Sequence, residues 1–266
     1  MKKRILPILA LTALFALSCK RDSSTTIRED FKTYYDQFKV IGSFILYDSQ
    51  KGLQICYNQS QLNQPFIPAS TFKICNSLIG LETGVVTDEN TVFKWDSIVR
   101  PVQNWNSDQN LKSAFKNSTV WYYQELARCV GGERMNLWLT KAGYGNMDTT
   151  GGIDKFWLTG ELRITPLEQI DFLTRLHDNK LPFSKRSIDI TKKIMVVKDS
   201  ANYTLRAKTG WSEQEGMQIG WYVGYIEKSN NVYYFANCVQ LKGEATDDFI
   251  RSRKEITLMI LKELGM

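Results

Sequence analysis

The sequence predicts an α+β fold in which a central antiparallel sheet is flanked by helices and joined to a mainly helical lobe. Two hairpin-like pairs of apolar runs, one near each end of the chain, predict the sheet lobe, about residues 31–65 and 186–266. Apolar residues at helical spacing predict the helical lobe, about residues 66–185. Residues 31–266 are long enough to bury a substantial core as a single domain.

The sheet and its covering helix follow from local patterns. Residues 42–48 and 53–58 flank a polar stretch and read as a hairpin, and residues 218–227 and 232–241 form a second one. These strands are expected to lie in one antiparallel sheet. Residues 247–264 repeat apolar side chains at helical spacing, so we expect a C-terminal helix that packs on the sheet beside an N-terminal helix.

The N-terminus predicts export. Residues 1–18 carry a basic start and an apolar stretch that is too short to span a membrane, which is typical of a secretory signal peptide. Cys19 follows and makes lipidation an alternative to simple cleavage, because the residues before it resemble a relaxed lipobox. Either route delivers a periplasmic protein or a lipid-anchored one that faces the periplasm. Residues 19–30 are polar and are expected to form a tether.

Charge and cysteine usage argue against two classes of partner. The net charge of +6 falls to about +3 without the signal peptide, and basic residues are scattered among acidic ones, so no nucleic-acid partner is expected. The cysteines lack metal-ligand spacing, so no metal is expected. One disulfide could form in an oxidising compartment, but the sequence does not indicate which two cysteines would pair. Beyond Cys19 the cysteines are Cys56, Cys75, Cys129 and Cys238.

Ser70 and Lys73 lie three residues apart at the start of an apolar segment, so on a helix they share one face. A serine hydroxyl is a weak nucleophile until a base within hydrogen-bond reach accepts its proton. The only histidine, His177, lies in a polar stretch with no nucleophile signature around it, and we expect a surface residue there. Lys73 is therefore the expected activator of Ser70.

Two further motifs strengthen this interpretation. Ser118-Thr119-Val120 follows a helix-like segment, and Lys208-Thr209-Gly210 ends a strand-like run that starts at Tyr203. Taken singly, the first also fits a helix cap and the second a turn after a strand. All three motifs together, in this order, indicate a serine enzyme with lysine as the base.

On these motifs the chain resembles the class D serine β-lactamases, the oxacillinases, within the wider penicillin-recognising family. The resemblance covers most of residues 40–260, and Tyr144-Gly145-Asn146 and Trp157 are its class-specific parts. It implies a β-lactamase/transpeptidase-like fold with the active site between the lobes. It also implies hydrolysis of penicillin-type antibiotics, with a small β-lactam as partner and antibiotic resistance as the outcome.

The resemblance implies a mechanism as well. Burial beside apolar groups such as Val120 would keep the Lys73 amine neutral, and carbon dioxide from bicarbonate would convert that amine to a carbamate. The carbamate would be the general base for acylation and deacylation, stabilised by the Trp157 indole N–H. Ser118 would relay a proton to the β-lactam nitrogen, and Lys208 would supply positive potential. No other cofactor is implied.

The remaining assignments concern the substrate. The oxyanion is expected to bind the backbone N–H groups of Ser70 and Trp211. Arg253 aligns with the family's carboxylate-binding arginine, and Arg251 is its nearby competitor. Further residues of the site are expected to bind substrate or to lie beside it. The substrate-binding residues are Trp105, Thr209, Gly210 and Arg253, and the site-adjacent ones are Tyr144 and Asn146.

Two alternatives remain open. Trp121 stands where the acquired oxacillinases commonly have proline and is similar to the related penicillin-sensor domains, which are acylated but not turned over. A cell-wall transpeptidase is the second alternative, and Val120 in place of the asparagine of S-D-N argues against it. The same departure argues against Glu161 as a class A deacylating base. Sensors are attached to several membrane spans, and one short apolar segment favours the free enzyme. The sequence makes no prediction about carbapenems or oligomeric state.

Overall fold

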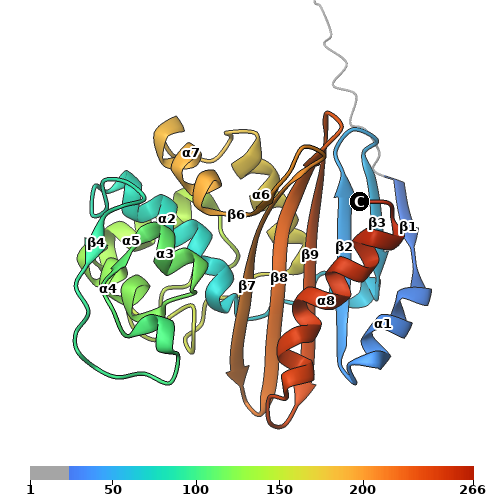
Figure 1. Ribbon diagram of the computed structural model, residues 1–266, viewed down its shortest axis with the longest axis horizontal. Coiled ribbons are helices and arrows are strands. Elements are labelled where there is room, and N and C mark those ends of the chain that lie inside the picture. Colours follow the sequence, from blue (N-terminus) through green and yellow to red (C-terminus); the bar gives the residue numbers. More distant parts are fainter. Residues whose placement is uncertain (1–23) are drawn as a thin grey trace, which may run out of the picture.

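A computed structural model describes residues 24–266, and the expected signal peptide and the candidate lipidation at Cys19 lie outside this range (Figure 1). Seven strands form one sheet in the order β1-β3-β2-β9-β8-β7-β6. Their bounds are β1 Ser24–Ile27, β2 Ile41–Asp48, β3 Leu53–Tyr57, β6 Val196–Asp199, β7 Thr204–Gln214, β8 Met217–Lys228 and β9 Asn231–Lys242.

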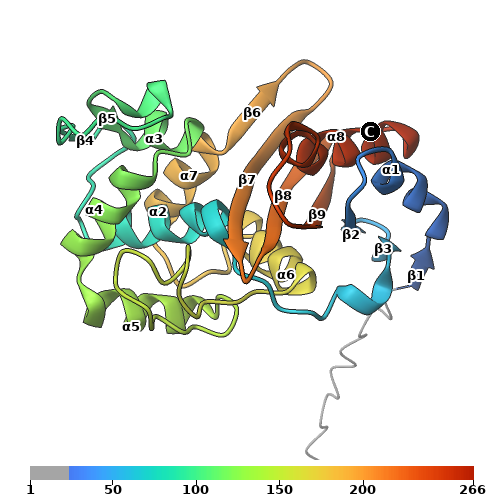
Figure 2. The same ribbon diagram turned by 90° about the horizontal axis from the view of Figure 1, so that it is seen from below.

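Helices cover both faces of the sheet, so the predicted α+β class is confirmed (Figures 1 and 2). Helices α1 and α8 lie on one face, whereas α6 packs on the other and leads into the helical lobe. A small two-stranded sheet of β4 Val92–Phe93 and β5 Gln109–Asn110 belongs to that lobe. The helices are α1 Lys32–Gln37, α2 Lys73–Glu82, α3 Leu111–Lys116, α4 Val120–Val130, α5 Gly132–Ala142, α6 Pro166–His177, α7 Lys185–Ile194 and α8 Asp247–Glu263.

Both predicted hairpins are present: β2 pairs antiparallel with β3, and β8 pairs antiparallel with β9. Because successive side chains of a strand point to opposite faces, β8 contributes to two cores. Trp221 and Val223 are buried in the core shared with the helical lobe, and Tyr222 is buried in the core beneath α8. The long central strands therefore connect the two halves of the molecule.

The N-terminal edge corrects two predictions. The sheet is mixed, because β1 pairs in parallel with β3. The predicted tether of residues 19–30 does not hold from residue 24 onward, where β1 begins. The N–H of Arg28 donates to the Cys56 carbonyl at 2.7 Å, and its guanidinium contacts Asp30 and Glu263 of α8. The unpaired edge of β3 thus recruits a polar, β-branched segment that carries no apolar pattern of its own.

The lobe boundary also differs from the sequence prediction. Helix α7 packs on α2 and α3, so the helical lobe extends to Ile194 and not only to about residue 185. Helix α2 is buried from Lys73 to Leu81 and lies among α4, α5 and α7. This burial fixes the first turn of α2 between the helical lobe and the sheet.

Close pairing of β7 with β8 can be tested at Gly224, which lies opposite Ala207. A Cβ atom at position 224 would lie 2.7 Å from the Ala207 Cβ and closer still to the Arg206 carbonyl oxygen. We expect Gly224→Ala to lower the free energy of unfolding by about 2 kcal/mol or more in urea titrations. Gly132→Ala is the control, because its Cβ would meet no atom within 4 Å. Equal stability of the two variants would contradict this packing.

Candidate active site

Ser70 lies in a 3₁₀ turn, Ala69–Phe72, that leads directly into α2. The Lys73 Nζ and Ser70 Oγ atoms lie 2.7 Å apart, so the expected common face is confirmed. Ala69 has a φ of 49°, a left-handed conformation that residues with a Cβ atom seldom adopt outside constrained sites. Gly210 of β7 packs against this turn, since a Cβ there would lie 2.9 Å from the Pro68 carbonyl oxygen.

The environment of Lys73 disfavours a positive charge. Its side chain is fully buried, and this burial lowers the pKa of the amine well below the usual value for lysine. The nearby charge of Lys208 lowers the same pKa further. Within residues 24–266 no carboxylate pairs with Lys73, and the Tyr123 ring centroid lies 5.2 Å from Nζ. The site therefore favours a neutral amine beside the Ser70 hydroxyl.

A second serine–lysine pair faces the first. Lys208 Nζ donates to Ser118 Oγ at 2.7 Å and to the Thr209 carbonyl at 3.1 Å. Burial, followed by the charge of Arg253, lowers the pKa of Lys208 to about 7. This lysine lies inside β7 and not at a strand end as predicted, because the pairing with β8 continues beyond Gly210 to Gln214.

Trp157 is a buried donor without a partner. Its side chain is fully buried and packs on Phe72 with ring centroids 5.4 Å apart, and no described residue accepts a hydrogen bond from its Nε1. Val120 begins α4, directly after the turn that carries Ser118. An unpaired indole N–H in an apolar setting is costly, and an anion beside it would satisfy it.

The two site-adjacent residues have structural roles. Tyr144 packs on Phe72 with ring centroids 5.5 Å apart and is fully buried. Asn146 closes a loop, because its Nδ2 donates to the Glu161 carbonyl at 2.8 Å and its Oδ1 accepts from the Arg163 N–H at 2.9 Å. These contacts close the turn that contains the Tyr144-Gly145-Asn146 motif.

Two tryptophans position the loop before Ser118. Trp105 donates through Nε1 to the Asn117 carbonyl at 3.0 Å, and Trp121 donates to the Trp105 carbonyl at 2.8 Å. Trp121 thus holds Trp105, a connection that the sequence analysis missed. The contact of Tyr123 with Lys73 was missed as well. No periodicity separates these two aromatic residues from ordinary core residues of α4.

Arg253, and not Arg251, reaches the site. Arg253 donates through Nη1 to the Gly210 carbonyl at 2.9 Å, and burial lowers its pKa to about 10. Arg251 is exposed and pairs with Asp248 at 2.8 Å. The side chain of Trp211, which follows Gly210, remains 45% exposed at the edge of the site. Lys208 and Thr209 lie on the same strand, β7, and belong to the same site.

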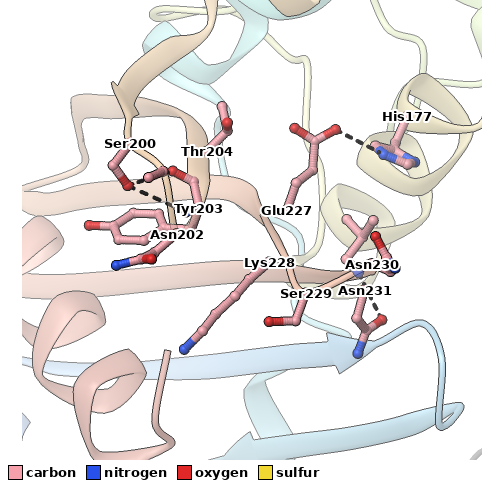
Figure 3. A pocket seen from close by; sticks show the side chains of 12 residues that line it. His177, Ser200, Asn202, Tyr203, Thr204, Glu227, Lys228, Ser229, Asn230 and Asn231 are labelled. Carbon is pink, nitrogen blue, oxygen red and sulfur yellow. Dashed lines mark hydrogen bonds and ion pairs between the residues drawn. The ribbon is translucent and has the colours of Figure 1, made fainter.

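His177 and Glu161 lie outside this arrangement. Figure 3 shows His177 in a different pocket of about 430 Å³, where its Nε2 lies 3.3 Å from Glu227 Oε1. The ring is half-buried and is less exposed than expected, because it packs on Tyr225. Glu161 is exposed and contacts Arg163 at 3.4 Å. Neither side chain has a hydrogen bond to Ser70.

Three further observations complete the description of residues 24–266. No group of three or more histidine, cysteine, aspartate or glutamate side chains in this range could hold a metal ion. No helix of this range is both long and apolar enough to cross a membrane. The four cysteines here are free thiols, so a disulfide among them is absent, and Cys56, Cys75 and Cys238 are buried.

The low pKa of Lys208 predicts a pH-dependent stability. Its pKa is about 7 in the folded protein against 10.5 ordinarily, so the unfolded chain binds more protons above pH 7. Stability contributed by this site must therefore rise with pH, by up to about 1.4 kcal/mol per pH unit. In urea titrations between pH 7.5 and 9, we expect the protein to gain stability relative to Lys208→Met. A pH-independent difference would contradict the assigned pKa.

Comparisons with known proteins agree with this geometry. Residues 31–262 match the family model of the penicillin binding protein transpeptidase domain. Beta-lactamase OXA-48 of Klebsiella pneumoniae is 41% identical over 261 residues, which cover 96% of this chain and 97% of that protein. The crystal structure of the class D β-lactamase YbXI from Nostoc has a TM-score of 0.86 at 44% identity, and the match covers 90% of this chain and 100% of that one.

A regulatory protein is also similar. BlaR1 of Bacillus licheniformis is 36% identical over 239 residues, which cover 90% of this chain but only 39% of that protein. The similarity to β-lactamases, by contrast, extends over nearly the full length of both chains. The paired serines and lysines, the matching family model and these relatives place the chain among the class D serine β-lactamases, within the penicillin-binding transpeptidase family.

Proposed function

We propose that this protein hydrolyses the amide bond of penicillin-type β-lactams through an acyl-enzyme on Ser70. One observation carries this proposal: the fully buried Lys73 amine lies 2.7 Å from the Ser70 hydroxyl and has no acidic partner among residues 24–266. Burial favours the neutral form of this amine, and its free lone pair can accept the proton of the Ser70 hydroxyl. Membership of the class D β-lactamases supports the substrate class.

Acylation begins when the Ser70 proton passes to the Lys73 side chain and Oγ attacks the β-lactam carbonyl. The negative charge that develops on the carbonyl oxygen is stabilised by the backbone N–H groups of Ser70 and Trp211. The close packing of Gly210 on the Ser70 turn supports this pairing, because it brings β7 against the nucleophile. A side chain at position 210 would push the strand away.

Ring opening requires a proton on the leaving nitrogen. The carbonyl carbon–nitrogen bond breaks, and the nitrogen takes a proton from the Ser118 hydroxyl, which lies 2.7 Å from Lys208 Nζ. Lys208 replaces the proton that Ser118 gives up and supplies positive potential beside it. The pKa of about 7 suits this exchange at neutral pH, because the amine can both give and regain a proton.

We further propose that Lys73 carries a carbamate, formed when carbon dioxide from bicarbonate adds to the neutral amine with loss of a proton. The carbamate supplies an oxygen base for both acylation and the water attack that releases the product. The surrounding residues fit this group, because the buried Trp157 Nε1 has no acceptor among the described residues. Val120 keeps the surroundings apolar, which favours the neutral amine that reacts.

The substrate is proposed to lie along β7. Arg253 and Thr209 would bind its carboxylate, as the contact of Arg253 with the Gly210 carbonyl supports. Trp105 would form a wall for the substrate side chain, and the hydrogen bond from Trp121 holds it in place. We propose that the protein acts after export, in the periplasm or lipid-anchored through Cys19, where it would confer resistance to β-lactams.

A penicillin sensor is the second candidate function, since the chain is also similar to BlaR1. A sensor would be acylated on the same serine and would keep the acyl group. Trp121 favours this alternative, because a tryptophan at this position is similar to the penicillin sensors. The Lys73–Ser70 hydrogen bond and the unpaired Nε1 of Trp157 favour hydrolysis, because they suit a carbamate base. The two functions differ in one measurable respect, namely the fate of the acyl-enzyme.

Hydrolysis of benzylpenicillin and of a chromogenic cephalosporin by the mature protein tests the proposal. We expect many turnovers, at a rate that rises with added bicarbonate. Lys73→Ala should fold and lose at least about 10³-fold in turnover, because no other base lies beside Ser70. Lys51→Ala is the matched control, since Lys51 is exposed in the β2–β3 turn. Intact mass spectrometry follows the adduct, and one equivalent of product with a stable adduct on Ser70 would establish the sensor.

A further inference from the structure

A second pocket, of about 640 Å³, is lined in part by Lys208 but not by Ser70 or Ser118. It is formed where α3, the end of α7, β6 and β7 meet, and Lys254 of α8 also lines it. Figure 2 shows β6 leaving α7 and running beside β7. Lys208 and Thr209 line this pocket and also belong to the proposed catalytic site. An occupant would therefore lie directly beside the catalytic lysine.

The pocket has an unbalanced positive charge. Five lysines line it, and no aspartate or glutamate does. Lys112, Lys116 and Lys254 form no salt bridge with any residue in the range 24–266, whereas Lys193 pairs with Glu89. Ammonium groups that line one cavity attract anions, because each repels its neighbours and gains by sharing a negative partner.

The interior of the pocket adds a polar group and an apolar surface. Tyr222, only 1% exposed, lines the pocket, and its hydroxyl has no hydrogen-bond partner among the described residues. A buried hydroxyl without a partner is costly, which points to a missing acceptor. Val196 and Val197, which are exposed, supply apolar surface beside the lysines.

We propose that this pocket binds an organic phosphate monoester with an apolar body. Phosphate oxygens would accept hydrogen bonds from Lys112 and Lys254, and from the buried Tyr222 hydroxyl after its side chain shifts toward the cavity; lysine is a common phosphate ligand. The body of the ligand would pack against Val196 and Val197. A phosphate monoester is mostly dianionic above pH 7, which matches several unpaired lysines better than a single carboxylate does.

Occupancy would also act on the catalytic site. A dianion beside Lys208 favours its ammonium form, so the ligand would keep this lysine protonated to higher pH. If hydrolysis proceeds as proposed, the alkaline limb of the kcat/KM profile would move to higher pH in the presence of the ligand. This second effect rests on the proposed function, whereas binding itself does not.

Phenyl phosphate is the probe, titrated by calorimetry and ³¹P NMR at pH 7.5 and constant ionic strength. We expect saturable binding of one equivalent, with affinity lower by at least about tenfold in the Lys112→Gln/Lys254→Gln variant and severalfold lower in Tyr222→Phe. The Lys51→Gln/Lys242→Gln variant removes the same charge from exposed positions outside the pocket lining and should bind as the unmodified protein does. Phenol, which lacks the charge, should not bind.

Two results would overturn the proposal. One is the absence of saturable binding, and the other is an unchanged affinity in the Lys112→Gln/Lys254→Gln variant. Phenyl phosphate could instead compete with benzylpenicillin, with the same strength in the lysine variants. This result would place the anion at Arg253 and not in the pocket. Single Lys254→Gln and Lys112→Gln variants, with thermal melting as a folding check, separate lost binding from lost structure. Because binding is measured without turnover, failure here leaves the hydrolysis proposal intact.

Discussion

The burial of one amine without a compensating charge governs this structure. Lys73 starts a helix that is enclosed on all sides, and a protonated lysine there would have no carboxylate among residues 24–266 to offset its desolvation. The neutral amine therefore has the lower free energy in this position, and it is also the reactive form. The same burial that packs the helical lobe around α2 therefore prepares the chemistry at Ser70, 2.7 Å away.

The sheet supplies the other half of the site by close approach. Gly210 lets β7 pack on the turn that carries Ser70, and Lys208 then reaches Ser118 across the gap between the lobes. Arg253 fixes the strand from α8 by bonding the Gly210 carbonyl. Burial lowers the pKa of both Lys73 and Lys208, and the charge of Lys208 adds to this effect at Lys73 as that of Arg253 does at Lys208.

Local sequence patterns predicted the parts of the structure that depend on local geometry. The three-residue spacing of Ser70 and Lys73 gave their common face, and apolar runs on either side of a polar turn gave both hairpins. Features that depend on distant contacts were missed. Strand β1 forms because β3 offers an edge, β7 continues past Lys208 because β8 pairs with it, and Trp121 matters because it meets Trp105. None of these has a periodic signal.

The central claim is that the buried Lys73 amine is neutral enough to take up carbon dioxide and that Trp157 stabilises the product. ¹³C NMR of the protein in ¹³C-bicarbonate tests this directly. The account predicts one carbamate resonance that disappears in Lys73→Ala and needs about tenfold or more bicarbonate in Trp157→Phe, since a hydrogen bond to an anion is lost. Trp138→Phe on α5 should behave as the unmodified protein. No carbamate signal at saturating bicarbonate, or one that survives Lys73→Ala, would contradict the account.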